Sequence, residues 1–209
     1  MSSHLPCKGT VIEEPSKTLT RSELGAVAIL LGEFWLQELT AQRIQQLSTS
    51  EIAAALEALD WSLPQPTEDD LVGSLERLQI DYCQLLIGPQ GHVSPVESVW
   101  ASDQFQSQSV DTMKSFFDLL PDYQPPDRFH DHIGVQLDFA GHLLIAADRQ
   151  PTNELEQADD LLETYVQQRV VWAKPMLKKV HQQAQTSFYR QLSTVTQEWI
   201  RFFESKPTS

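Results

Sequence analysis

The sequence contains only two cysteines, Cys7 and Cys83, which are too far apart to form a C-x-x-C pair. Two such thiols are typical neither of a disulfide framework nor of a zinc site, and we interpret Cys83 as a small core residue. Long hydrophobic runs are also missing. The longest is AVAILL at 26–31, whereas a membrane-spanning helix needs about 20 apolar residues. The first ten residues lack the apolar segment of a secretory signal. We therefore expect a cytoplasmic protein without stable membrane association.

Basic residues are scarce, because 15 Lys and Arg stand against 29 Asp and Glu in 209 residues, a net charge of −14. Sequence-independent binding of DNA or RNA needs clustered cations, so nucleic acid is excluded as a partner. The same charge disfavours an anionic membrane surface. A partner that is basic, apolar or both remains possible. Since 41% of the residues are hydrophobic, the chain is large enough to build its own core.

Strand signals are nearly absent, since period-2 alternation is rare and no Asn-Gly or Asp-Gly turn occurs. Helical periodicity instead recurs along the chain. The first predicted helix begins at a capping box formed by Thr20 and Glu23. The segment 128–147 is apolar on most sides, so we expect it to be central and buried. A helix that starts at about 153 is predicted to be kinked or ended by Pro175, at Lys174. The other predicted helices cover 21–39, 50–59, 67–87, 103–119, 128–147 and 187–203. The predicted fold is all-α, a single compact multi-helix bundle.

The domain organisation follows from one loop. Residues 88–98, GPQGHVSPVES, hold two Gly and two Pro and are the best candidate for a hinge. We predict a flexible tail over 1–17 and one helical domain over 18–205. Within that domain, the hinge separates a part over 18–87 from a part over 99–205.

Two clusters of polar residues are candidates for binding. The run His130-Asp131-His132 precedes the buried helix, where a capping role is the simpler interpretation. As a polar lip on a groove, however, Asp131 could accept a guanidinium group through both oxygens. Trp100, with Glu97 nearby, lies beside the Gly/Pro loop. It could anchor a peptide or plug the core where the loop rejoins a helix.

Catalytic signatures are weak. Asp138 and His142 are four residues apart and would share one helix face, which suits a polar contact better than a metal site. No nucleophile elbow or phosphate loop occurs. We therefore predict no catalytic residue, no metal and no cofactor. The alternative of a metal-dependent helical hydrolase would use Asp131, His132, Asp138 and His142.

Five short segments of the sequence are distinctive when taken together: DYCQLLIGP at 81–89, PVESVW at 95–100, HDHIGVQLDF at 130–139, WAKP at 172–175 and FYR at 188–190. These segments resemble motifs of the TorD/DmsD family of cytoplasmic molybdoenzyme chaperones. They follow one another in the order expected for that family over about 67–203. The chain departs from the family patterns at Leu86, Val96 and His130, where those patterns have Phe, Tyr and Pro.

The resemblance implies a function for the chain. Members of that family are all-helical proteins that bind the twin-arginine leader of a molybdenum-cofactor enzyme and delay its export until the cofactor is inserted. It also implies a site. Asp131 and His132 match the pair tied to leader binding, and six further residues match motif positions near the groove: Tyr82, Gly88, Pro89, Glu97, Ser98 and Trp100.

The expected partner is therefore the catalytic subunit of an enzyme of the DMSO or TMAO reductase type, contacted through its leader. An assembly chaperone of a non-exported nitrate reductase is the alternative within the same superfamily. The hinge at 88–98 could also allow a homodimer that exchanges one helical part between protomers.

Overall fold

The computed structural model describes residues 19–47, 61, 71–89, 91–102, 108–149 and 155–204. In these ranges the chain is helical, apart from loops and one isolated β-bridge, as the sequence predicted. None of the described helices is both long enough and apolar enough to cross a bilayer. The helices are α1 (Arg21–Leu36), α2 (Ala41–Leu47), α4 (Leu71–Tyr82), α5 (Glu97–Ser102), α6 (Gln108–Phe117), α7 (Ile133–Ala147), α8 (Leu155–Arg169), α9 (Ala173–Gln183) and α10 (Ser187–Glu204), with a π-helical turn, η2 (Cys83–Ile87), after α4.

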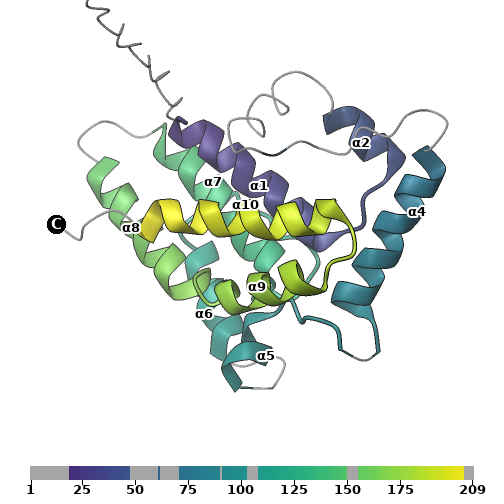
Figure 1. The fold of residues 1–209 in the computed structure, drawn as a ribbon. Coiled ribbons are helices and arrows are strands. Elements are labelled where there is room, and N and C mark those ends of the chain that lie inside the picture. Colours follow the sequence, from purple (N-terminus) through teal and green to yellow (C-terminus); the bar gives the residue numbers. More distant parts are fainter. Residues whose placement is uncertain are drawn as a thin grey trace, which may run out of the picture.

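The centre of the fold is an antiparallel pair formed by α1 and α7 (Figure 1). Each helix carries two glycines seven residues apart, and Gly25 faces Gly141 while Gly32 faces Gly134. A Cβ atom added at Gly141 would lie 2.5 Å from the Gly25 carbonyl oxygen, and one at Gly32 would lie 2.6 Å from that of Gly134. The two backbones are therefore in direct contact, which only glycine permits.

The capping box at the start of α1 is confirmed. The Glu23 amide donates to Thr20 Oγ1 at 3.2 Å, and the Thr20 amide donates to Glu23 Oε2 at 2.8 Å. The predicted burial of 128–147 is also confirmed, because α7 is buried over most of its length. It is shorter than predicted, however, since residues 128–132 form bends and turns ahead of Ile133.

The last helix, α10, crosses in front of the central pair (Figure 1) and buries an apolar stripe against it. Two indole groups fix its position. Trp35 Nε1 donates to Thr196 Oγ1 at 3.1 Å, and Trp199 Nε1 donates to the Leu24 carbonyl at 3.2 Å. Each bond satisfies a buried N–H group that would otherwise weaken the core. The predicted helix over 187–203 thus closes one side of the bundle.

Two predicted boundaries are wrong. Pro175 does not end the preceding helix, because α8 already stops at Arg169 and Pro175 lies in the first turn of α9. In that turn the missing N–H of proline costs nothing. The predicted hinge is also too long, since Glu97 and Ser98 begin the short helix α5. The predicted helix over 50–59 and the first four residues of the predicted helix over 67–87 lie outside the described residues.

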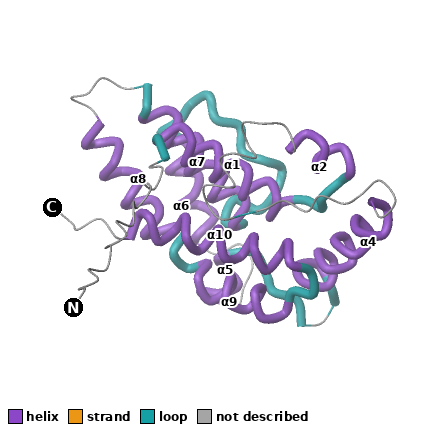
Figure 2. Tube along the Cα trace, turned by 45° about the horizontal axis from the view of Figure 1, so that its top comes forward, coloured by secondary structure: helices purple, strands orange, loops and turns teal. Residues whose placement is uncertain are grey.

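Cys83 is exposed, so our interpretation of it as a core residue is wrong. The buried side chains of this segment recur at helical spacing, at Leu78, Tyr82, Leu85 and Leu86, and Cys83 lies one position off that face. Leu85 and Leu86 remain buried while Cys83 and Ile87 face outward. In both views α4 lies at the edge of the molecule (Figures 1 and 2).

Candidate functional site

Two segments singled out in the sequence, at 95–100 and 130–139, lie side by side in the structure. Val96 and His132 form an antiparallel β-bridge. The Glu97 amide donates to the Asp131 carbonyl at 2.9 Å, and the Ile133 amide donates to the Pro95 carbonyl at 2.8 Å. We call residues 94–100 and 130–136 the junction. It brings five of the eight predicted leader-binding residues together.

Asp131 occupies the centre of the junction and is completely buried. Its Oδ2 atom accepts a hydrogen bond from the Ser98 amide at 3.0 Å, in the first turn of α5. It therefore caps a helix that begins more than thirty residues earlier in the chain. Its Oδ1 atom is buried and has no hydrogen-bond partner within the described part of the chain. The carboxylate holds α5 against the start of α7 instead of lying on an open lip.

His132 is the N-cap residue of α7. Its Nδ1 atom accepts a hydrogen bond from the Gly134 amide at 3.0 Å, so this nitrogen carries no proton. Burial, together with the charge of Arg128, lowers the pKa of His132 to about 4. The imidazole is consequently neutral at physiological pH and orients the first turn of the central helix.

Glu97 connects the junction to α8 through a partly buried polar network, which consists of Glu97, Gln136, Arg169 and Trp172. Glu97 pairs with Arg169 Nη1 at 3.2 Å and accepts from Gln136 Nε2 at 2.7 Å. Gln136 Oε1 in turn accepts from Trp172 Nε1 at 2.8 Å. Burial raises the pKa of Glu97, and the Arg169 charge and the Gln136 hydrogen bond act in the opposite direction.

Trp100 is half-buried and packs against the hydrophobic core. Its Nε1 atom donates to the Ser94 carbonyl at 2.8 Å, which closes the turn between the loop and α5. The indole therefore plugs the junction and still presents part of its surface to solvent. Ser98, two residues earlier, is fully buried.

The remaining three predicted residues lie at the other end of the loop, at the end of α4 and directly after η2. Tyr82 is buried beside Tyr189, with ring centroids 6.1 Å apart, and burial is the main cause that raises its pKa to about 12. The Gly88 amide donates to the Cys83 carbonyl at 2.7 Å and ends η2. Pro89 is exposed. Among the described residues, no hydrogen bond or ring contact of these three reaches the junction.

Our choice of site residues missed Asp81, although it belongs to the segment at 81–89. Its carboxylate accepts from the Gln185 amide, from the Thr186 amide at 2.7 Å and from Thr186 Oγ1 at 2.6 Å. It thus holds the turn directly before α10 against the end of α4. Gln136 and Arg169 were also missed. A lone amide side chain among the apolar residues at the start of a buried helix was the signal that could have identified Gln136.

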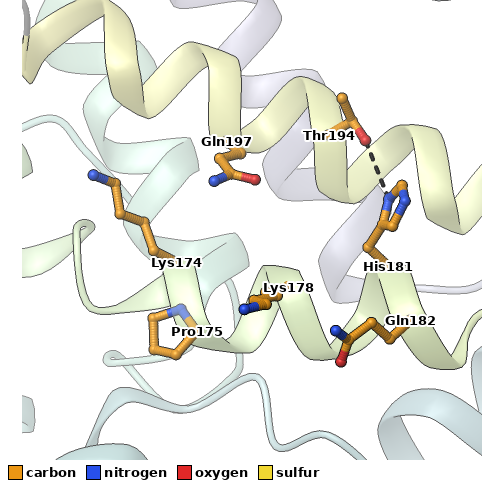
Figure 3. Close-up of a pocket in the computed structure, with 7 residues that line it drawn as sticks. All are labelled: Lys174, Pro175, Lys178, His181, Gln182, Thr194 and Gln197. Carbon is orange, nitrogen blue, oxygen red and sulfur yellow. Dashed lines mark hydrogen bonds between the residues drawn. The ribbon is translucent and has the colours of Figure 1, made fainter.

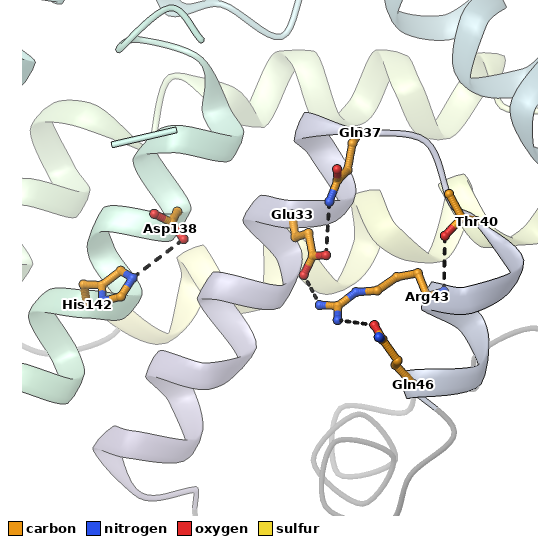
Figure 4. Close-up of polar contacts among 7 residues, drawn as sticks. All are labelled: Glu33, Gln37, Thr40, Arg43, Gln46, Asp138 and His142. Carbon is orange, nitrogen blue, oxygen red and sulfur yellow. Dashed lines mark hydrogen bonds and ion pairs between the residues drawn. The ribbon is translucent and has the colours of Figure 1, made fainter. Parts of the chain in front are cut away.

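Asp138 and His142 form the expected contact along α7, with 3.9 Å between Asp138 Oδ1 and His142 Nε2 (Figure 4). Tyr123 donates to the second oxygen, Asp138 Oδ2, at 2.7 Å. Burial raises the pKa of Asp138, while the Tyr123 hydrogen bond and the His142 charge act to lower it. Over the described ranges, no three His, Cys, Asp or Glu side chains lie close enough together to hold one metal ion.

Comparison with known proteins agrees with the resemblance seen in the sequence. The family model described as "Nitrate reductase delta subunit" matches residues 45–178. The chain is also similar to a chaperone protein TorD of Vibrio atlanticus (strain LGP32), with 24% identity over 186 residues that cover 79% of this chain and 85% of that protein. No solved structure matches the chain. The matched region contains the whole junction and the polar network.

Proposed function

This chain belongs to the nitrate reductase delta subunit family, and on that premise we propose that it is a cytoplasmic maturation chaperone of a molybdenum-cofactor enzyme. It binds the twin-arginine leader of the catalytic subunit and holds that subunit until the cofactor is in place. We propose no catalytic step for the chain. The observation that carries the proposal is the junction, where two of the segments that resemble the family meet through a β-bridge.

The surroundings of the junction suit a leader that is basic at one end and apolar in the middle. Phe129, directly before the junction, is 44% exposed, and Trp100 presents part of its ring. Three exposed carboxylates lie on the segment that leads into the junction, at Asp118, Asp122 and Asp127. We propose that the rings contact the apolar run and that these acids attract the arginine pair.

Buried Asp131 has a different role in this proposal. Because its carboxylate caps α5, it acts as a positioning residue that holds the segment carrying Trp100. Asp131→Asn keeps an oxygen that can accept from the Ser98 amide, whereas Asp131→Ala does not. If Asp131 acts by position, leader affinity survives in the Asn variant and falls about tenfold or more in the Ala variant. A direct ion pair with the leader would weaken both.

The test is titration of the full chain with a synthetic twin-arginine leader, followed by fluorescence anisotropy at low and moderate salt. We expect Trp100→Ala to weaken binding. We also expect the pair Asp118→Asn and Asp122→Asn to weaken it most at low salt. The pair Glu76→Gln and Asp160→Asn is the matched control. Both residues are exposed and lie away from the junction sequence, on α4 and α8, and this pair of substitutions removes two negative charges, as the first pair does. Failure to bind any leader from the molybdoenzymes of its own host would refute the function.

A second client is favoured by the family description, which names the nitrate reductase delta subunit. The chain would then assemble a nitrate reductase that is not exported and carries only a remnant leader. The same titration separates the two clients. Replacement of the arginine pair of the peptide by glutamines abolishes binding in the first case and leaves it nearly unchanged in the second. The homodimer with exchanged parts stays a prediction, to be checked by sedimentation of the purified chain.

A further inference from the structure

A groove between α9 and α10 is lined by basic and amide side chains, although the chain as a whole is acidic. Its cavity volume is about 510 Å³, within the range of ligand sites in proteins. Helix α9 contributes Lys174, Lys178, His181 and Gln182, and α10 contributes Thr194 and Gln197 (Figure 3). The described residues that line it include two lysines and no carboxylate.

One cation in the groove is unpaired. Lys174 forms an ion pair with Glu204 at one end. His181 points its Nδ1 atom toward α10, 3.3 Å from both Thr194 Oγ1 and the Arg190 carbonyl (Figure 3). Lys178 forms neither a hydrogen bond nor an ion pair within the described ranges, and the same holds for the amides of Gln182 and Gln197. One ammonium group and two amides therefore remain to bind a ligand.

This set of groups fits a carboxylate. One cation balances one negative charge, and the amides can donate to the second oxygen. A phosphate dianion would need a second free cation, and Lys174 already holds Glu204. The pair of Lys174 and Glu204 shows that a carboxylate is accommodated by a lysine at the end of the same groove.

We propose that the groove between α9 and α10 binds an acidic peptide segment of a partner protein, with one of its carboxylates on Lys178. Charge complementarity supports this occupant. Most of the surface of a chain with net charge −14 repels an acidic peptide, so this groove, whose lining contains no carboxylate, is where such a segment can dock. The proposal goes beyond leader binding and does not depend on it, because none of the lining residues belongs to the junction.

The experiment uses a labelled peptide of about ten residues with alternating Glu and Ser, blocked at both ends, and its Gln counterpart. Fluorescence anisotropy with the full chain should show saturable binding of the Glu peptide only. Lys178→Gln should weaken it about tenfold, and Lys178→Arg should retain it. Lys179→Gln is the matched control, since Lys179 is the next residue on α9, is exposed and does not line the groove. We expect this control to stay within about twofold of the unmodified chain.

Several outcomes would overturn the proposal. If the Gln peptide bound as tightly as the Glu peptide, the groove would not recognise a carboxylate. If Lys178→Gln and Lys179→Gln weakened binding equally, the effect would come from the net charge of the chain and not from Lys178. Displacement by free succinate at the concentrations that saturate the peptide would identify a small-molecule site. Binding of inorganic phosphate in place of the peptide would also contradict the assignment. A dimer that Lys178→Gln dissociates would make a second copy of the chain the occupant.

Discussion

The α1–α7 pair and the junction are both buried, but they are held together by different physics. Between α1 and α7 the contact is apolar, and four glycines let the backbones touch. At the junction the contact is polar, since Asp131 and Glu97 are carboxylates placed almost out of reach of water. Burial of a charged group costs desolvation free energy, and well-packed apolar side chains at the same place would not have this cost. Such a costly arrangement suits a functional site, whereas the glycine contact serves the fold alone.

Gly141→Ala should produce the largest effect and should break the first of these regions. The added Cβ would meet the Gly25 carbonyl oxygen at 2.5 Å, and a backbone atom in a packed helix pair cannot move aside cheaply. We expect a loss of about 4 kcal/mol in the free energy of unfolding, measured by urea denaturation followed by circular dichroism. This is a considerable part of the total stability of a typical domain.

The matched control for Gly141→Ala is Gly73→Ala, because Gly73 is a partly buried glycine in α4. Alanine favours helix over glycine by about 1 kcal/mol, so this variant should be neutral or more stable. If both glycine variants behaved alike, the contact of the two backbones would not be what stabilises the α1–α7 pair.

Glu97→Ala should have the next largest effect and tests the second region. It leaves partly buried Arg169 and the fully buried Gln136 amide without their partner. We expect a loss of about 3 kcal/mol in the free energy of unfolding, since removal of one member of a buried ion pair is strongly destabilising. The double variant Glu97→Leu and Arg169→Leu should recover most of that loss. If the network serves leader binding, the double variant folds but binds the leader weakly.

The sequence was most informative where structure is local. The capping box of Thr20 and Glu23 involves residues three apart, and the burial of α7 follows from its own apolar composition. The extent of α10 could be read from periodicity in the same way. Each of these helices carries its own signals in its sequence, so its buried face was predicted correctly, although α7 begins five residues later than predicted.

The site was less predictable, because its contacts join residues distant in sequence. Asp131 accepts from a helix amide 33 residues away, and Asp81 accepts from the turn before α10, 105 residues away. An aspartate near a helix start looks the same in sequence whether it faces solvent or caps another helix. The π-helical turn at Cys83–Ile87 could not be predicted either, because the residues that form it are also common in α-helices. The resemblance singled out two segments that lie side by side in the structure, and the structure shows which of their side chains are buried and which are exposed.

His132 offers the smallest and most specific way to separate the two regions, because the α1–α7 glycine contact does not titrate. Its pKa is lowered from 6.5 to about 4 in the folded chain. The unfolded chain therefore takes up a proton first, and the stability that neutral His132 contributes is present above pH 6.5 and is lost as the pH falls toward 4. Between pH 7 and pH 5 this loss should be about 2 kcal/mol. His132→Asn retains an N-cap acceptor but takes up no proton in this range, so its urea denaturation midpoint should fall less over the same interval. Equal pH dependence of the two proteins would mean that His132 is not held neutral at the start of α7.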